Sequence, residues 1–182
     1  MDFNSLHQTS TQPIVCFEEH LLELEGITRG LPATDDLEVA FSRILREAQA
    51  GARATLRIVR GGRPRGLCPV IRQDVYRIGR EAVLNALRHS GASRVEVDLE
   101  YSPTQLRITV RDDGKGITPG LFASGRGDHK GLSAMRDLAE RMGAKLKLLS
   151  RVAAGTEVEL SIPGHIAFAS PTNAHRWGWA YV

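Results

Sequence analysis

Two neighbouring segments of the chain alternate strictly between apolar and polar residues. The stretch RVEVDLE, residues 94–100, places valine, valine and leucine on one face and charged side chains on the other. Residues 106–110 repeat the alternation after a turn at Ser102-Pro103. This pattern predicts a β-hairpin whose sheet has one apolar face, and other elements have to cover that face.

Helical periodicity predicts what covers it. From Pro69 to His89 the apolar positions step by four, three and four residues, which marks one face of a helix. The order of the predicted helices and strands along the chain predicts an α/β (α+β) fold. This fold is a two-layer sandwich with a mixed, mostly antiparallel sheet and helices on one face. Further helices are predicted at 16–29, 37–48 and 132–142, and further strands at 54–60, 145–150 and 156–162.

The composition places the chain among ordinary globular domains. Hydrophobic residues make up 42% of the 182 residues and charged residues 25%, which is enough for a core. The formal net charge is +3, but the arginines are spread along the chain, so we expect no direct nucleic-acid site. The two cysteines lack metal-ligand spacing and no apolar run is long enough to span a bilayer, which favours a cytoplasmic protein.

The chain divides into three parts by its patterning. We expect the folded domain to span residues 35–163, where the periodic segments lie. Residues 1–34 begin polar and unpatterned, which is typical of a flexible N-terminus. Residues 164–182 carry aromatic side chains without a period, and we expect them to form an unstructured tail.

The apolar stripe of the long helix ends in polar residues. Its last turns place Glu81, Asn85 and His89 four residues apart, with Arg88 three residues after Asn85. An asparagine amide oxygen beside a carboxylate can hold Mg²⁺, and an arginine one turn further can offset the charge of a phosphate. The alternative is an ordinary helix end, in which Arg77 pairs with Glu81 and His89 interacts with the C-terminal dipole.

The motif RDDGKGI, residues 111–117, follows the second strand of the hairpin. Asp112 shares the parity of Val110 and therefore points toward the core, whereas Asp113 faces the other way. A carboxylate directed into a core needs a hydrogen-bond donor, and the amino group of an adenine would supply one. The glycines of the motif would let the backbone approach a ring closely. The alternative is a plain turn, because Asp-Gly is common in hairpins.

Two weaker signals lie downstream. The glycine-rich loop 113–131 suits a mobile lid, in which Lys130 and the backbone amides near Gly131 meet phosphates. A plain surface loop is the alternative. In the last strand Thr156 has inward parity, so its hydroxyl would face the same interior as Asp112, although inward threonines are common in strands.

Taken together and in this order, four segments resemble the ATP-binding domain of bacterial two-component sensor histidine kinases. REAVLNALRHSGA resembles the N-box, RDDGKGI the G1 box, HKGLSAMRDLAERMGA the G2 region and GTEVELSIP the closing Gly-Thr strand. Among these kinases, the segments resemble those with short catalytic domains, which are usually paired with LuxR-type response regulators. The kinases belong to the superfamily of gyrase, chaperone, histidine kinase and mismatch-repair ATPases. The resemblance covers residues 35–163 and implies the Bergerat-type ATP-binding fold.

The resemblance implies a role for each matching residue. Asn85 would be the Mg²⁺ ligand, and Glu81 would orient or activate the water shell of the metal or the phosphoryl acceptor. Asp112 would read the adenine amino group, with Thr156 supporting it directly or through a water. The other implied contacts are Arg88 and His89 at the phosphates, with Arg88 counted among the catalytic residues, Gly114, Gly116 and Ile117 around the pocket, and His129, Lys130, Gly131 and Leu132 at the lid.

The chain departs from the family pattern in two places. Asp128 stands where the family often has glycine, which adds negative charge near the expected lid. The phosphoacceptor of the family lies in a helical hairpin within a His-Asp or His-Glu pair, and neither His7 (in HQ) nor His20 (in HL) fits. We therefore expect residues 1–34 to include the end of that hairpin, and the chain to be the catalytic part of a longer kinase or a stand-alone remnant.

The implied function is binding of ATP and Mg²⁺ and transfer of the γ-phosphoryl group to a histidine on a separate helical dimerisation domain. That domain would lie in the full-length protein or act in trans, and a response regulator would be the downstream partner. The expected location is cytoplasmic, including the cytosolic part of a membrane-bound sensor. Two alternatives stay open: a non-catalytic ATP-binding module that acts through partner contacts, and a serine kinase of the anti-sigma type.

Overall fold

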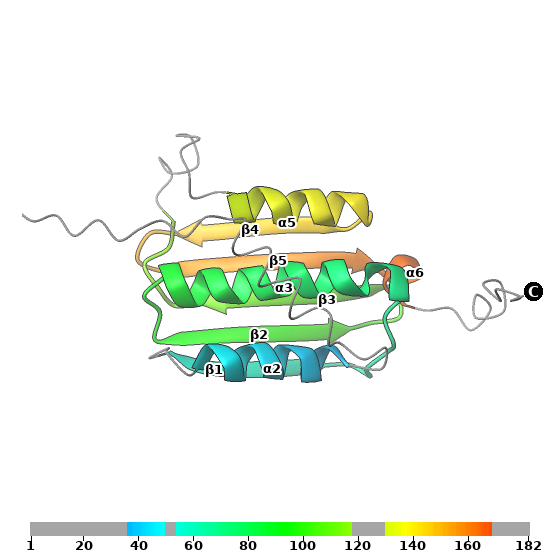
Figure 1. Cartoon of the computed structure of the whole chain (residues 1–182), viewed down its shortest axis with the longest axis horizontal. Helices are drawn as coiled ribbons and strands as arrows, with labels where there is room; N and C mark the ends of the chain where they lie inside the picture. The colour runs from blue at the N-terminus through cyan, green and yellow to red at the C-terminus, as the bar shows by residue number, and fades with distance from the viewer. Residues whose placement is uncertain (1–35, 50–53, 118–129, 169–182) are drawn as a thin grey trace, which may run out of the picture. The chain divides into compact units, whose positions relative to one another are not determined.

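The computed structural model describes residues 36–49, 54–117 and 130–168, all within one compact unit, Leu31–Val182 (Figure 1). The predicted helix at 16–29, most of the expected lid and the residues after 168 lie outside the described residues. Among the described helices, none is both long and apolar enough to cross a bilayer. The elements follow in the order α2 (Leu37–Gln49), β1 (Thr55–Gly61), α3 (Pro69–His89), β2 (Arg94–Tyr101), β3 (Gln105–Asp112), α5 (Lys130–Arg141), β4 (Lys145–Arg151), β5 (Gly155–Pro163) and α6 (Gly164–Ala167).

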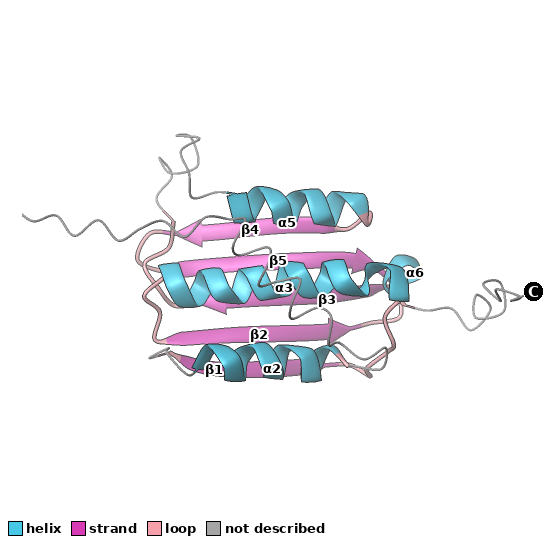
Figure 2. Ribbon diagram, viewed as in Figure 1, coloured by secondary structure: helices cyan, strands magenta, loops and turns pink. Residues whose placement is uncertain are grey.

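The five described strands form one sheet in the order β1-β2-β3-β5-β4. β1 runs parallel to β2, and the three other pairings are antiparallel. Figure 2 shows α2, α3 and α5 lying side by side over the same face of the sheet, with α3 in the middle. The predicted two-layer fold, with a mixed and mostly antiparallel sheet, is therefore confirmed.

The two faces of the sheet differ in chemistry as the alternation predicts. The apolar side chains of β2 and β3 are buried under the helices, and Val95, Val97, Leu99 and Leu106 have no exposed surface. The opposite face carries exposed ion pairs, each of which contributes little to stability. They include Arg111–Glu157 (2.6 Å), Arg107–Glu100 (2.9 Å) and Lys147–Glu159 (3.3 Å).

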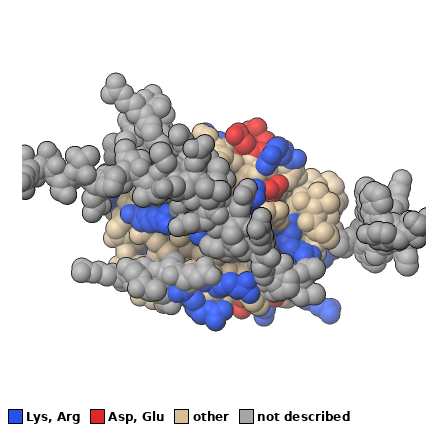
Figure 3. Space-filling view, viewed as in Figure 1, with Lys and Arg blue, Asp and Glu red and all other residues tan. Residues whose placement is uncertain are grey.

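Helix α3 is the central element of the helical layer. It starts at Pro69, whose missing N–H is no loss in the first turn. Ile71, Val75 and Ile78 are buried against the sheet. A side chain at Gly79 would overlap the ring of Phe41, so the glycine lets α2 approach α3 closely. Figure 3, viewed from this helical side, shows lysine and arginine side chains at separate places over the described surface rather than in one patch.

The segment after β5 corrects one prediction. Residues 164–168 are not a tail, because α6 and Phe168 pack against the core at the N-terminal end of α3. The backbone N–H of Cys68 donates to the carbonyl oxygen of Ala167 at 2.9 Å. The Phe168 ring stacks on Tyr101 with 6.4 Å between the ring centres. A single turn of helix followed by one aromatic residue has no periodicity, so the sequence pattern does not reveal it.

Candidate functional site

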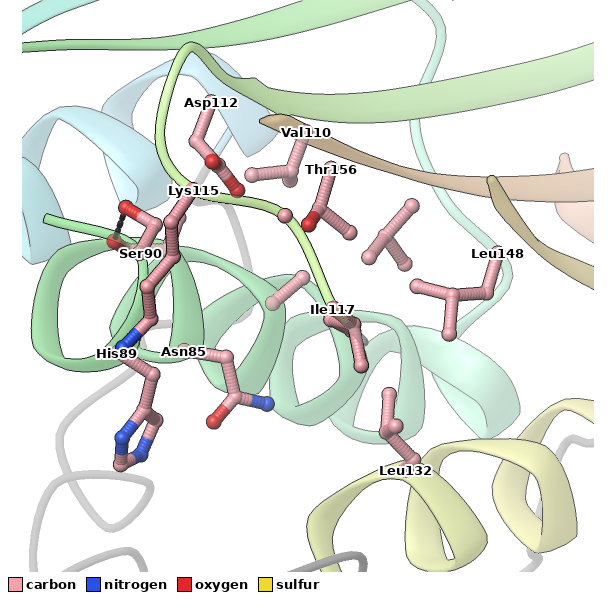
Figure 4. A pocket seen from close by; sticks show the side chains of 14 residues that line it. Asn85, His89, Ser90, Val110, Asp112, Lys115, Ile117, Leu132, Leu148 and Thr156 are labelled. Atoms are coloured by element: carbon pink, nitrogen blue, oxygen red, sulfur yellow. Dashed lines mark hydrogen bonds between the residues drawn. The ribbon is translucent and has the colours of Figure 1, made fainter. Parts of the chain in front are cut away.

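A pocket of about 220 Å³ lies at the C-terminal end of α3, where the apolar stripe of that helix turns polar (Figure 4). The end of β3 and the start of β5 form its inner side, and the loop after β3 and the start of α5 border it. Most of its walls are apolar, and the polar groups converge at its two ends. The lining residues are Ala82, Asn85, Ala86, His89, Ser90, Val110, Asp112, Lys115, Gly116, Ile117, Leu132, Leu148, Thr156 and Val158.

Asp112 and Thr156 form the inner polar end of the pocket. They lie directly opposite each other in the antiparallel pairing of β3 and β5. The backbone N–H of Gly114 donates to Asp112 Oδ1 at 2.9 Å. Burial raises the pKa of Asp112 above its ordinary value, although hydrogen bonds from the backbones of Gly114 and Thr156 and from Ser90 act against this. The ionised carboxylate is therefore incompletely solvated, and a donor on a ligand would stabilise it.

The neighbouring aspartate has the opposite environment. Asp113 Oδ1 accepts hydrogen bonds from the backbone N–H groups of Ser93 and Arg94, both at 2.8 Å, and Oδ2 accepts one from the Ser93 hydroxyl at 2.7 Å. The Ser93 hydroxyl is the main cause that lowers the pKa of Asp113. Asp113 therefore ties the end of β3 to the start of β2 and does not line the pocket.

The loop after β3 passes between the end of α3 and the turn that joins β4 to β5. A Cβ at Gly114 would overlap the Ser90 carbonyl, and one at Gly116 would overlap the Arg151 carbonyl. Gly116 also has a positive φ of 69°, which side chains disfavour. The glycines thus allow a close approach of the loop to these two backbone segments, whereas their predicted approach to a ligand ring stays a prediction. Lys115, which lines the pocket between them, is a residue that the sequence analysis missed.

Ser150 is a second residue that the sequence analysis missed. Its hydroxyl accepts a hydrogen bond from the backbone N–H of Ile117 at 2.7 Å and lies 3.0 Å from the hydroxyl of Thr156. It therefore joins the loop after β3 to the inner end of the pocket. Ser150 is separated from Ile117 by 33 residues along the chain, so no local pattern could reveal this contact.

At the outer end, the structure separates the predicted residues of α3 into two groups. Asn85 and His89 line the pocket and project at its open side (Figure 4), whereas Glu81 and Arg88 are not among its lining residues. A Cβ at Gly131 would overlap the carboxylate of Glu81, so Glu81 faces the start of α5.

The predicted lid residues are divided in the same way. Leu132 lines the pocket from the first turn of α5. Gly131 lies against Glu81 rather than in the lining. His129 and the side chain of Lys130 lie outside the described residues.

Comparison with known proteins places this pocket within a family. Residues 71–166 match the family described as Histidine kinase-, DNA gyrase B-, and HSP90-like ATPase. The chain is 38% identical over 84 residues to the nitrate/nitrite sensor protein NarX of Escherichia coli, covering 46% of this chain and 14% of NarX. It is 33% identical over 93 residues to the sensor histidine kinase LiaS of Bacillus subtilis, covering 51% of this chain and 25% of LiaS. The chain thus spans a quarter or less of the length of these relatives.

Solved structures show the same fold. The histidine kinase domain of a blue-light activated histidine kinase from Erythrobacter litoralis EL346 superposes with a TM-score of 0.54 at 26% identity, over 80% of this chain and 70% of that domain. The catalytic domain of the histidine kinase ThkA superposes with a TM-score of 0.57 at 17% identity, over 71% of this chain and 94% of that domain. Because the family match covers more than half of the chain and runs from α3 to α6, this chain belongs to the histidine kinase-, DNA gyrase B- and HSP90-like ATPases.

Proposed function

We propose that this chain binds ATP with Mg²⁺ and acts as the catalytic domain of a sensor histidine kinase. The observation that carries the proposal is the polarity of the pocket. A half-buried carboxylate with a raised pKa, that of Asp112, stands at the inner end, and Asn85 and His89 stand at the open end. This arrangement suits a ligand with a hydrogen-bond donor on a flat ring at one end and negative charge at the other.

The inner half of the pocket fits an adenine ring. Alanine, valine, leucine and isoleucine side chains form its walls, which suits a planar heterocycle. The adenine amino group would donate to Asp112, and this would offset the incomplete solvation that raises the pKa of that carboxyl. Thr156, held by Ser150, would contribute a second polar contact at the same end.

The outer end fits phosphates and a weakly caged Mg²⁺. No cluster of three or more histidine, cysteine or acidic side chains that could hold a metal occurs among the described residues. A Mg²⁺ held mainly by phosphates and water, with Asn85 as its protein ligand, needs no such cluster. When bound, the ion would neutralise charge on the phosphates. His89 lines the same end, and Arg88 and Glu81 lie on the same helix outside the lining.

The reaction would need little covalent chemistry from the protein itself. The bond between the γ-phosphorus and the bridging oxygen breaks, a phosphorus–nitrogen bond to the acceptor imidazole forms, and ADP leaves. Positioning and charge neutralisation govern such transfers. The acceptor histidine would come from a separate helical dimerisation domain, and a response regulator in the cytoplasm would then receive the phosphoryl group. Relatives named as sensor histidine kinases support this assignment.

The binding step is tested with the same substitution at two adjacent aspartates, of which Asp112 lines the pocket and Asp113 does not. Asp112→Asn should abolish measurable ATP binding in calorimetry, because the amide presents its own donor toward the adenine amino group. Asp113→Asn should bind ATP like the wild type at a temperature where both are folded. Unchanged affinity in Asp112→Asn would contradict the adenine assignment.

The transfer step is tested with labelled ATP, Mg²⁺ and a histidine-containing helical hairpin supplied in trans. We expect acid-labile phosphohistidine on the hairpin and its loss in Asn85→Ala. ATP binding without any transfer would support a non-catalytic binding module. Acid-stable phosphoserine on a protein substrate would support the anti-sigma type of kinase.

A further inference from the structure

The loop after β3 carries one charged side chain, Lys115, that lines the pocket. Gly114 packs against the Ser90 carbonyl and Gly116 against the Arg151 carbonyl, and neither position has room for a Cβ. Lys115, between them, is exposed and lines the pocket. The two glycines therefore let the backbone lie close to both elements. The side chain of Lys115, between them, stays exposed at the pocket.

The backbone of Lys115 is held on both sides. Its N–H donates to the carbonyl oxygen of Ser90 at 2.9 Å, and its own carbonyl accepts a hydrogen bond from the N–H of Ala153 at 2.8 Å. The side chain thus starts from a fixed point. Figure 4 shows it extending from the loop toward the end of α3, where Asn85 and His89 project.

The charges around the pocket leave the Lys115 ammonium available for a negatively charged ligand. Asp112, the acidic side chain of the lining, lies at the inner end. Within the described part of the chain, no carboxylate lies within ion-pair distance of the Lys115 ammonium. An ammonium is a compact charge with three donors, which suits the oxygens of a phosphate chain.

We propose that Lys115 binds the phosphate chain of the nucleotide, beside the C-terminal end of α3. The phosphates would then be held by two elements together, by Lys115 from the loop after β3 and by the polar end of α3. This inference rests on the proposed function and extends it, because nothing in the resemblance or the comparisons assigns a role to this lysine.

The test compares Lys115→Ala, Lys115→Arg and a matched control, Lys147→Ala. Lys147 lies on the open face of the sheet, where its ammonium is 3.3 Å from Glu159. Binding of ATP, ADP and adenosine to the full 182-residue chain is measured by calorimetry, and thermal unfolding shows that each variant is folded. We expect Lys115→Ala to weaken ATP about tenfold and ADP to a lesser degree.

Three further results are expected. Adenosine, which has no phosphate, should bind Lys115→Ala with an affinity within about twofold of the wild type, because a neutral ligand gains nothing from the ammonium. Lys115→Arg should keep most of the affinity for ATP, and Lys147→Ala should keep all of it. The difference between wild type and Lys115→Ala should shrink at high salt, because an exposed charge is screened.

Two results would overturn the inference alone: wild-type affinity of Lys115→Ala for ATP, or an equal loss for adenosine, which would mean that the lysine only shapes the loop. Failure of the wild-type chain to bind ATP at all would overturn the proposed function together with the inference. The titrations of ATP and adenosine into wild type and Lys115→Ala distinguish these three outcomes.

Discussion

The two ends of α3 lie in opposite environments. At its N-terminal end, Leu67, Ala167 and Phe168 close the core with apolar contacts. At its C-terminal end, the core gives way to a pocket with a carboxylate at its inner side and Asn85 at its open side. The first end stabilises the fold, whereas the second presents polar groups to the pocket. Stability and binding are therefore expected to respond to different substitutions.

The largest effect on stability is expected at the closed end. Phe168 is buried and stacks on Tyr101, so Phe168→Ala should lower the free energy of unfolding by about 3 kcal/mol. The affinity of the remaining folded molecules for ATP should not change. Chemical denaturation and calorimetry check the two parts, and Phe168→Leu, with a smaller loss, is the control. A large drop in ATP affinity would show that the two ends are coupled.

The next effect is expected where the loop after β3 meets α3. Gly114→Ala would place a Cβ on the Ser90 carbonyl, and backbone cannot yield as a side chain does, so we expect a loss of about 2 kcal/mol. ATP affinity should fall as well, because the loop carries Lys115 and directly follows Asp112. Gly66→Ala is the matched control, since a Cβ there meets nothing within 4 Å. Equal unfolding midpoints for both variants would contradict the steric overlap expected between a Cβ at Gly114 and the Ser90 carbonyl.

A smaller effect concerns the aspartate outside the pocket. The pKa of Asp113 is lowered in the folded chain, so its hydrogen bonds stabilise the fold above the ordinary aspartate pKa of about 3.9. This contribution is lost as the pH falls through the folded value. Asp113→Asn should therefore unfold at a lower temperature than wild type at pH 7, and the difference should shrink in acid. Thermal melts across this range measure it.

The smallest effect has the opposite sign. The pKa of Asp112 is raised in the folded chain, so folding is favoured by its protonated form and stability is lost as the pH rises through the folded value. Asp112→Asn should therefore melt at a slightly higher temperature than wild type at pH 7 without ligand, and this gain should vanish in acid. A lower melting temperature at pH 7 would show that the carboxylate is structural.

Sequence patterns predicted the framework because the framework is local. The helix predicted at 37–48 is α2, and the carboxylate of the preceding Asp36 accepts a hydrogen bond from the N–H of Glu38 at 3.2 Å, as is typical at a helix start. The strict alternation in β3 predicted that Asp112 lies on the same side as Val110, and both line the pocket. Residues a few positions apart along the chain determine such features, so the periodicity of the sequence predicts them.

What the sequence did not reveal depends on contacts between distant segments. Ser150 meets Ile117 across 33 residues, and Phe168 meets Tyr101 across the sheet. Lys115 belongs to the motif RDDGKGI, yet its direction follows from the carbonyl groups that press on the glycines beside it. The roles of the predicted site residues stay predictions, because they depend on a ligand as well as on the fold.

The direction of α3 has an electrostatic consequence. A helix carries partial negative charge at its C-terminus, and it is this end of α3 that meets the pocket. Phosphate sites are commonly built at the opposite, positive end of a helix. On the proposed function, the dipole of α3 opposes a bare polyanion, and the cations nearby have to outweigh it. The pocket would therefore favour a nucleotide that arrives with its own metal ion over one that arrives without it.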